Sequence, residues 1–141
     1  MVKEGGGMKY RRPSKNNPYW IEPELYDTVV HFCRCYPLWL KELQTLPDSS
    51  KAISYDGDRV QTSGGYDVTS ALALKRVEVE RKVDLIRTTA MIANSEIWEW
   101  IIKGTTENYS VQELIQQGMP CSRNYYSKVR GYFYYLLSKR I

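Results

Sequence analysis

The segment from Ser70 to Ala93 constrains the fold more than any other part of the chain, because its apolar residues recur with helical spacing. One set recurs every seven residues: Leu72, Val79, Ile86 and Ala93. Val83 and Ala90 fall between them, and a further set widens the apolar face: Leu74, Val77, Leu85 and Ile92. This pattern predicts one helix over residues 70–93, with Asp67 or Thr69 as its N-cap.

The width of that apolar face indicates how the helix packs. A narrow seam is typical of a coiled coil, whereas a wide face indicates a helix that several neighbours cover. We therefore expect a central scaffold helix. A homodimer seam through residues 70–93 is the alternative.

Prolines divide the chain before this helix into two shorter ones. Pro23 can occupy a first helical turn, and the apolar residues after it are spaced by three or four: Leu25, Val29, Phe32, Cys33 and Tyr36. Pro37 should break or kink this helix, and a second one is expected over residues 38–46, before Pro47.

A short helix is also expected after the long one. Its apolar residues are Ile97, Trp98, Ile101 and Ile102. Ser95 can cap its start and Gly104 can close its end. Its tryptophans are expected to fill the core.

Two segments are expected to lie outside the packed helices. Residues 1–18 contain Gly5-Gly-Gly7 and two prolines, which predicts a flexible basic arm ahead of a single helical domain over 19–141. Tyr19-Trp20-Ile21 should dock on that domain, because large aromatic side chains are costly to leave in water. Residues 47–68 are rich in Ser, Asp and Gly, which predicts an exposed loop, or a weak hairpin over 51–62 around Asp56-Gly57.

Residues 108–141 have the pattern of a short helix, a tight turn and a longer helix. Ser110-Val-Gln-Glu113 fits a capping box, after which Leu114 and Ile115 should be buried. Gly118 permits the positive φ that a sharp turn needs, Pro120 ends the first helix, and Ser122 can cap the second. In the commonest helix-turn-helix pattern an apolar residue follows the turn glycine by six positions, where this chain has Asn124. A turn longer by one residue would bring Tyr125 to that place.

These elements together predict an all-α fold. We expect a compact helical bundle with a long central helix and a C-terminal helix-turn-helix-like pair. A length of 141 residues suits one domain. The chain has no apolar run of about 20 residues and no apolar N-terminal segment, so we expect neither a membrane span nor a secretory signal, and a location in the cytoplasm.

The positive charge is concentrated at the two ends of the chain. Residues 1–15 carry five basic residues against one acidic residue, and residues 119–141 carry five basic residues and no acidic one. A helical wheel of residues 122–140 places an apolar set on one side: Tyr125, Tyr126, Val129, Phe133, Leu136 and Leu137. The expected outward set comprises Arg123, Asn124, Ser127, Lys128, Gly131, Tyr134 and Tyr135.

Arg, Asn, Ser and Lys are the side chains that read base edges and contact phosphates. A helix-turn-helix places its second helix in the DNA major groove, and a basic arm adds phosphate affinity. The residues expected to contact double-stranded DNA are therefore Arg123, Asn124, Ser127, Lys128, Arg130, Lys139, Arg11 and Arg12. A capped helical hairpin with no binding role is the alternative reading of the same residues.

We expect no metal site, no cofactor and no enzymatic activity. His31, Cys33 and Cys35 are close in sequence, but residues i and i+2 of a helix point apart, and no second Cys or His pair completes a zinc site. The cysteines are expected to be reduced helix residues. Gly5-Gly-Gly7 lacks the lysine of a phosphate-binding loop.

Several short motifs resemble small phage and prophage proteins of Gram-positive bacteria. They include Tyr19-Trp20-Ile21, Tyr36-Pro37-x-Trp39, Ile101-Ile-Lys-Gly104 and Pro120-Cys-Ser-Arg-Asn-Tyr-Tyr126. The layout is similar to ArpU/RinA-type late transcription regulators, whose C-terminal part resembles sigma factor region 4. The resemblance implies promoter binding through the last helix, by Arg123, Asn124, Ser127, Lys128 and Arg130, in the cytoplasm of a bacterial host cell.

Two other functions fit the sequence. The tyrosine-rich C-terminal segment is compatible with a protein-interaction module that inhibits or adapts a host enzyme, such as RNA polymerase or a defence nuclease, because tyrosine and arginine are enriched at interfaces. A small terminase-like packaging subunit, which forms rings on DNA, is the other alternative.

Overall fold

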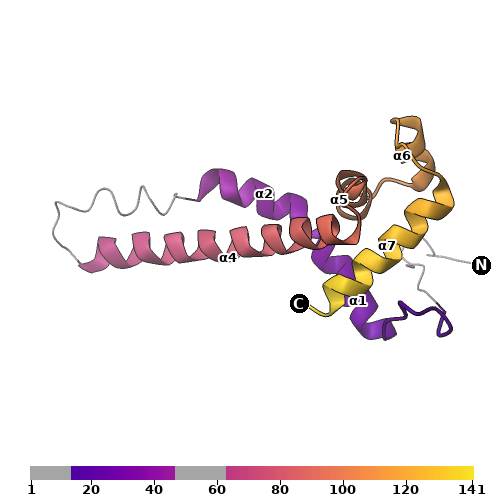
Figure 1. Cartoon of the computed structure of the whole chain (residues 1–141). Helices are drawn as coiled ribbons and strands as arrows, with labels where there is room; N and C mark the ends of the chain where they lie inside the picture. The colour runs from indigo at the N-terminus through magenta and orange to yellow at the C-terminus, as the bar shows by residue number, and fades with distance from the viewer. Residues whose placement is uncertain (1–13, 47–62) are drawn as a thin grey trace, which may run out of the picture.

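The computed structural model of the protein describes residues 14–46 and 63–141, with side chains from residue 70 onward in the second range. All regular structure in these ranges is helical, which confirms the predicted all-α class with a long central helix and a C-terminal helix pair (Figure 1). The helices are α1 (Pro23–Arg34), α2 (Tyr36–Thr45), α4 (Ser63–Ala93), α5 (Trp98–Thr106), α6 (Val111–Gln116) and α7 (Arg123–Ser138). None of them is long and apolar enough to cross a membrane.

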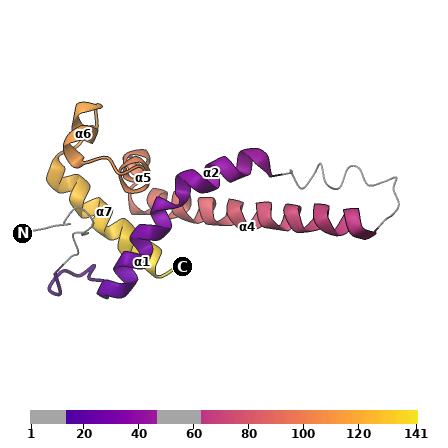
Figure 2. The same ribbon diagram turned by 180° about the vertical axis from the view of Figure 1, so that it is seen from behind.

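The helices form a head and a projecting hairpin (Figures 1 and 2). Helix α2 leads away from the head, and α4 returns beside it in the opposite direction. The C-terminal part of α4 then enters the head, where α5 and α7 pack against it, α1 packs against α5 and α7, and α6 lies at one end of α7. We call α2 together with the first part of α4 the α2–α4 hairpin.

The predicted apolar face of α4 is buried in the head and in the part of the hairpin next to it. Val83, Ile86 and Ala90 belong to the core of the head and are each at most 2% exposed, and Val79, which lines a groove with Trp39 and Glu42 of α2, is 3% exposed. Leu72, at the hairpin end, is 40% exposed although it belongs to the same set. Three of the residues that widened the apolar face, Leu74, Val77 and Ile92, are also exposed. Leu72, Leu74 and Val77 are exposed because the hairpin is only two helices thick, so one side of α4 has no neighbour there.

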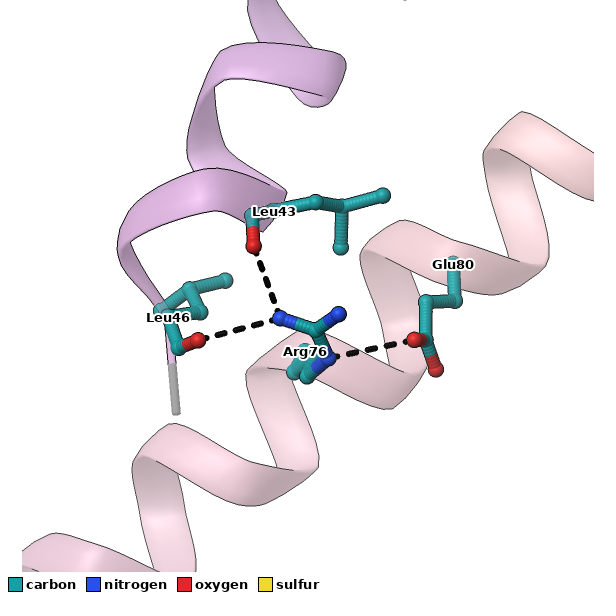
Figure 3. A network of polar contacts seen from close by, with 4 residues as sticks. All are labelled: Leu43, Leu46, Arg76 and Glu80. Atoms are coloured by element: carbon teal, nitrogen blue, oxygen red, sulfur yellow. Dashed lines mark hydrogen bonds and ion pairs between the residues drawn. The ribbon is translucent and has the colours of Figure 1, made fainter. Parts of the chain in front are cut away.

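Hydrogen bonds from the Arg76 side chain join α2 to α4 (Figure 3). The Arg76 guanidinium donates from Nη1 to the carbonyl oxygens of Leu43, at 2.7 Å, and Leu46, at 3.0 Å. These carbonyls lie at the C-terminal end of α2, where a helix leaves its last acceptors unpaired and where the helix dipole favours a cation. Glu80, one turn along α4, accepts from Arg76 Nε at 3.1 Å and orients the guanidinium.

Two helices meet near Pro37 as predicted, but α2 begins at Tyr36, two residues before the predicted start, and therefore contains both Tyr36 and Pro37. Cys35 ends α1 and also precedes α2, whose first turn contains Pro37. The backbone N–H of Cys35 donates to the carbonyls of His31 and Phe32, so the chain changes direction within one residue. Leu25, expected on the apolar face of α1, is 38% exposed, and its neighbour Tyr26 is buried instead, against Tyr134 of α7.

Three further predicted helix ends were wrong. Helix α4 begins at Ser63, so Asp67 and Thr69 lie inside it, and residues 63–68 do not belong to the expected loop 47–68. The other part of that loop, and the alternative hairpin over 51–62, lie outside the described residues. Ser95 does not cap α5: the Asn94 side chain accepts from the N–H groups of Glu96 and Ile97 instead.

Gly104 does not end α5, which continues to Thr106. A Cβ atom at this position would collide with the Tyr126 hydroxyl of α7 and lie 2.9 Å from Leu114 Cδ1. The glycine therefore serves close packing of α5 against α6 and α7 and does not stop the helix.

Candidate nucleic-acid interface

The C-terminal helix pair begins with the predicted capping box. The Ser110 hydroxyl accepts from the N–H of Glu113 at 3.1 Å, and the Glu113 carboxylate accepts from the N–H of Ser110 at 2.8 Å. Gly118 has a φ of 105°, as the turn prediction required, and Ser122 caps α7 by accepting from the N–H of Tyr125. Leu114 is fully buried, whereas Ile115, also expected to be buried, is 37% exposed.

The turn between α6 and α7 is longer than predicted. The Met119 N–H donates to the carbonyl of Leu114, and the Met119 side chain is buried inside the turn. The first buried residue of α7 is consequently Tyr126, which is 1% exposed, and not Tyr125. Tyr125 is 43% exposed, and its hydroxyl accepts from Asn94 Nδ2 at 2.6 Å.

The buried side of α7 is broader than the helical wheel predicted. Tyr126, Val129, Phe133 and Leu137 are buried as expected, because α1, α4 and α5 all pack on this helix. Tyr134 is buried too, at 7% exposure, with its ring edge-on to Tyr26 of α1. The prediction that Tyr134 faces outward was wrong. The helical wheel assumed that only one side of α7 is packed, whereas α1 covers a second side.

The first two turns of α7 present the expected polar residues to solvent. Arg123, Asn124 and Lys128 are exposed, and Ser127 is half-buried. The Arg123 guanidinium donates from Nη2 to Gln112 Oε1 of α6 at 3.1 Å. Gln112 could not be predicted as part of the site, because no local spacing marks a contact between residues eleven positions apart.

The second half of the outward side of α7 is covered by the chain's own N-terminal segment. The Tyr19 ring lies 4.9 Å from the Tyr132 ring and 5.4 Å from the Tyr135 ring, measured between centroids. This agrees with the expected docking of residues 19–21. It also restricts the open part of α7 to its N-terminal half. Gly131, at the border, has no atom within 4 Å of where a Cβ would stand.

The other basic candidates are spread along α7 and beyond it. Arg130 is half-buried, with its guanidinium 5.4 Å from the centroid of the Tyr126 ring. Lys139 follows the end of α7 and lies over the Tyr135 ring. The structure brings Arg123, Asn124, Ser127 and Lys128 together, whereas Lys139 is about 24 Å from Arg123 along the helix. Arg11 and Arg12 lie outside the described residues.

Burial controls the ionisation of the groups beneath this surface. Burial raises the pKa of the Tyr134 hydroxyl well above its ordinary value, and it also raises the pKa of Tyr126, where the nearby Arg130 opposes it. The pKa of the Cys33 thiol is raised by burial, against a hydrogen bond with Thr105. These groups stay neutral near pH 7, so Arg123, Lys128 and Arg130 set the charge of α7.

Two further observations complete the description of the site. Within residues 14–46 and 63–141, no group of three or more His, Cys, Asp or Glu residues lies close enough together to hold a metal ion. The chain matches no family model, no curated protein and no solved structure. The features of the molecule that bear on function are therefore the geometry and charge of α6 and α7.

Proposed function

We propose that the protein is a DNA-binding regulator of phage or prophage transcription that inserts the N-terminal half of α7 into the major groove. One observation carries the proposal: a capped, sharply turned helix pair whose second helix exposes Arg123, Asn124 and Lys128 on its first two turns. Recognition helices commonly contact bases with their N-terminal residues, and the first helix of such a pair crosses the backbone.

The side-chain chemistry supports this mode of binding. Arg pairs with guanine and Asn with adenine in the major groove, while Lys and Ser contact bases or phosphates. Residues 119–141 contain no acidic residue that would repel phosphates. The Arg123–Gln112 hydrogen bond holds the guanidinium near the start of α7, where the positive end of the helix dipole also favours an anion.

The N-terminal basic arm can act on the same DNA. Tyr19 packs on α7 beside the open surface, so the basic residues before it are tethered to that side of the molecule. The segment just before Tyr19 is turned, because the Asn17 N–H donates to the Ser14 carbonyl at 2.9 Å. The basic residues ahead of Ser14, Arg11 and Arg12, would add phosphate contacts next to α7.

A binding measurement with matched charge variants tests the proposal. Fluorescence anisotropy with random duplex DNA should give micromolar or tighter affinity that falls steeply with salt. Lys128→Glu should weaken binding by roughly tenfold or more. Lys41→Glu changes the net charge equally at an exposed site on α2 and should have a much smaller effect. Absence of binding at low salt, or equal effects of the two variants, would refute the proposal.

The alternative functions make different predictions. The tyrosines that suggested a protein-interaction module are mostly packed: Tyr126 and Tyr134 are buried, and Tyr132 and Tyr135 contact Tyr19. A host partner recovered by pull-down after nuclease treatment would nevertheless favour that function over DNA binding. A terminase-like subunit would form rings, so a mass below that of a ring in light scattering would exclude it.

A further inference from the structure

The side of α4 that faces away from the core carries a second regular pattern. Its residues are spaced alternately by three and four positions: Ala71, Leu74, Glu78, Arg81, Leu85, Thr88 and Ile92. Leu74 is 65% exposed and Ile92 is 50% exposed, while Leu85 is half-buried because part of its side chain packs against the core of the head. Spacing of this kind forms a straight stripe that suits contact with another helix. We call these seven residues the outer stripe.

The hairpin gives the outer stripe a rigid base and a recess. A groove of about 470 Å³ runs along one edge of the stripe, with Trp39 and Glu42 of α2 opposite Leu74 and Glu78 of α4. The neighbouring lysines are held toward α2: Lys75 lies 3.5 Å from the Glu42 carboxylate, and Lys82 lies over the Trp39 ring. Glu78 and Arg81 are therefore the charged residues at the middle of the stripe, and both are exposed.

We propose that the outer stripe binds the outer stripe of a second copy of this chain, with the two α4 helices antiparallel. The charges at the centres of the two stripes are complementary. A two-fold axis between residues 79 and 80 brings Glu78 of each copy to Arg81 of the other, so two ion pairs form at the centre. The same register brings Leu74 of each copy to Leu85 of the other. The outer stripe is thus complementary to a second copy of itself, as an isologous interface requires.

Other occupants fit this surface less well. One acidic and one basic residue at its centre give no net attraction for a polyanion, so nucleic acid is disfavoured. A parallel arrangement of two copies in register would bring Glu78 against Glu78 and Arg81 against Arg81. This dimer uses residues of α4 only and none of the α7 residues assigned to the DNA contact.

Charge reversal tests both the surface and its register. The wild type should be a dimer in sedimentation velocity and light scattering, whereas Glu78→Arg and Arg81→Glu should each raise the dimer dissociation constant by at least about tenfold, since each creates two like-charge contacts. Mixing the two single variants restores complementary pairs, so the mixture should form a heterodimer. The double variant, which exchanges the two charges within one chain, should dimerise again.

Charge reversals outside the outer stripe serve as controls. Glu99→Arg reverses an exposed charge on α5 and should leave the dimer intact, as should Lys128→Glu on α7. Circular dichroism confirms that each variant folds. A wild type that stays monomeric at about 100 µM would overturn the proposal. So would single variants that dimerise like the wild type, or a mixture that fails to associate.

Discussion

Two helical glycines, Gly104 and Gly131, differ in what surrounds them. A Cβ on Gly104 would collide with the Tyr126 hydroxyl, whereas the corresponding space at Gly131 is open. Gly104 is therefore required by tertiary packing between α5 and α7. Gly131 lies inside α7, where a glycine weakens the helix because it has more conformational freedom to lose on folding.

Alanine at these two positions should act in opposite directions. Gly104→Ala should lower the free energy of unfolding by about 1–3 kcal/mol, because the buried contact with Tyr126 must open. Gly131→Ala should raise it by about 0.4–1 kcal/mol. Urea unfolding followed by circular dichroism measures both. Adding Tyr126→Phe to Gly104→Ala removes the colliding hydroxyl, so the two changes should be non-additive; simple additivity would contradict the packing argument.

The caps of the C-terminal helix pair were predicted correctly, whereas the burial of Tyr134 was not. Ser110 and Glu113 cap each other within four residues, so their pattern is visible in the sequence. The burial of Tyr134 depends on α1, about a hundred residues earlier, and a helical wheel contains no such neighbour. The outward residues Arg123, Asn124 and Lys128 were predicted because they precede the crowded part of α7.

At the scale of elements, the α2–α4 hairpin depends on Arg76. Its guanidinium supplies the C-terminal carbonyls of α2 with donors, and its side chain is 20% exposed, so solvent screens the interaction only partly. The ion pair between Lys75 and Glu42 joins the same two helices with side chains that are 55% and 40% exposed. The first contact should therefore stabilise the hairpin much more than the second.

Arg76→Ala and Lys75→Ala should differ in their effect on the free energy of unfolding. Arg76→Ala should lower the free energy of unfolding by about 1–2 kcal/mol and reduce hydrogen-exchange protection in α2. Lys75→Ala should change it by at most about 0.5 kcal/mol. Both are measured at low protein concentration, so that self-association does not contribute. Equal effects of the two substitutions would show that Arg76 contributes no more than an ordinary surface charge.

The helices themselves were predicted better than their ends. Apolar periodicity and prolines located α1, α2 and the main part of α4. The N-terminal turns of α4 carry little apolar pattern, and Gly64-Gly65 reads locally as a helix breaker, so the sequence placed the start seven residues late. The six-residue turn before α7 also escaped prediction, because its length depends on the burial of Met119.

At the scale of the whole molecule, the heptad pattern of α4 has two separate uses. Val83, Ile86 and Ala90 belong to the core of the head, whereas Leu74 and Ile92 of the outer stripe remain accessible. The sequence suggested a scaffold helix and a dimer seam as alternatives for one face. The structure shows the scaffold face, and the dimer that we propose would use a different face of the same helix, so it would not compete with the core.

The proposed dimer and the proposed DNA contact together predict the form of the DNA site. A two-fold axis across α4 relates the two copies of α7, and a two-fold protein matches a DNA site with the same symmetry. Selection from random duplexes should therefore enrich an inverted repeat for the wild type. The Glu78→Arg variant retains α7 but should lose the partner copy, so it should select single half-sites with lower affinity.

The possible results separate the two proposals. Failure to enrich any sequence would count against specific DNA recognition by α7 and would leave the dimer unaffected. Half-sites selected by a wild type that sediments as a dimer would mean that the two copies of α7 cannot reach one duplex together. A direct repeat would exclude the antiparallel arrangement, because only a head-to-tail assembly relates successive copies by translation along the DNA. If the wild type instead selects an inverted repeat, the spacing of its two half-sites gives the separation of the two α7 helices, since each helical turn of DNA corresponds to about 34 Å.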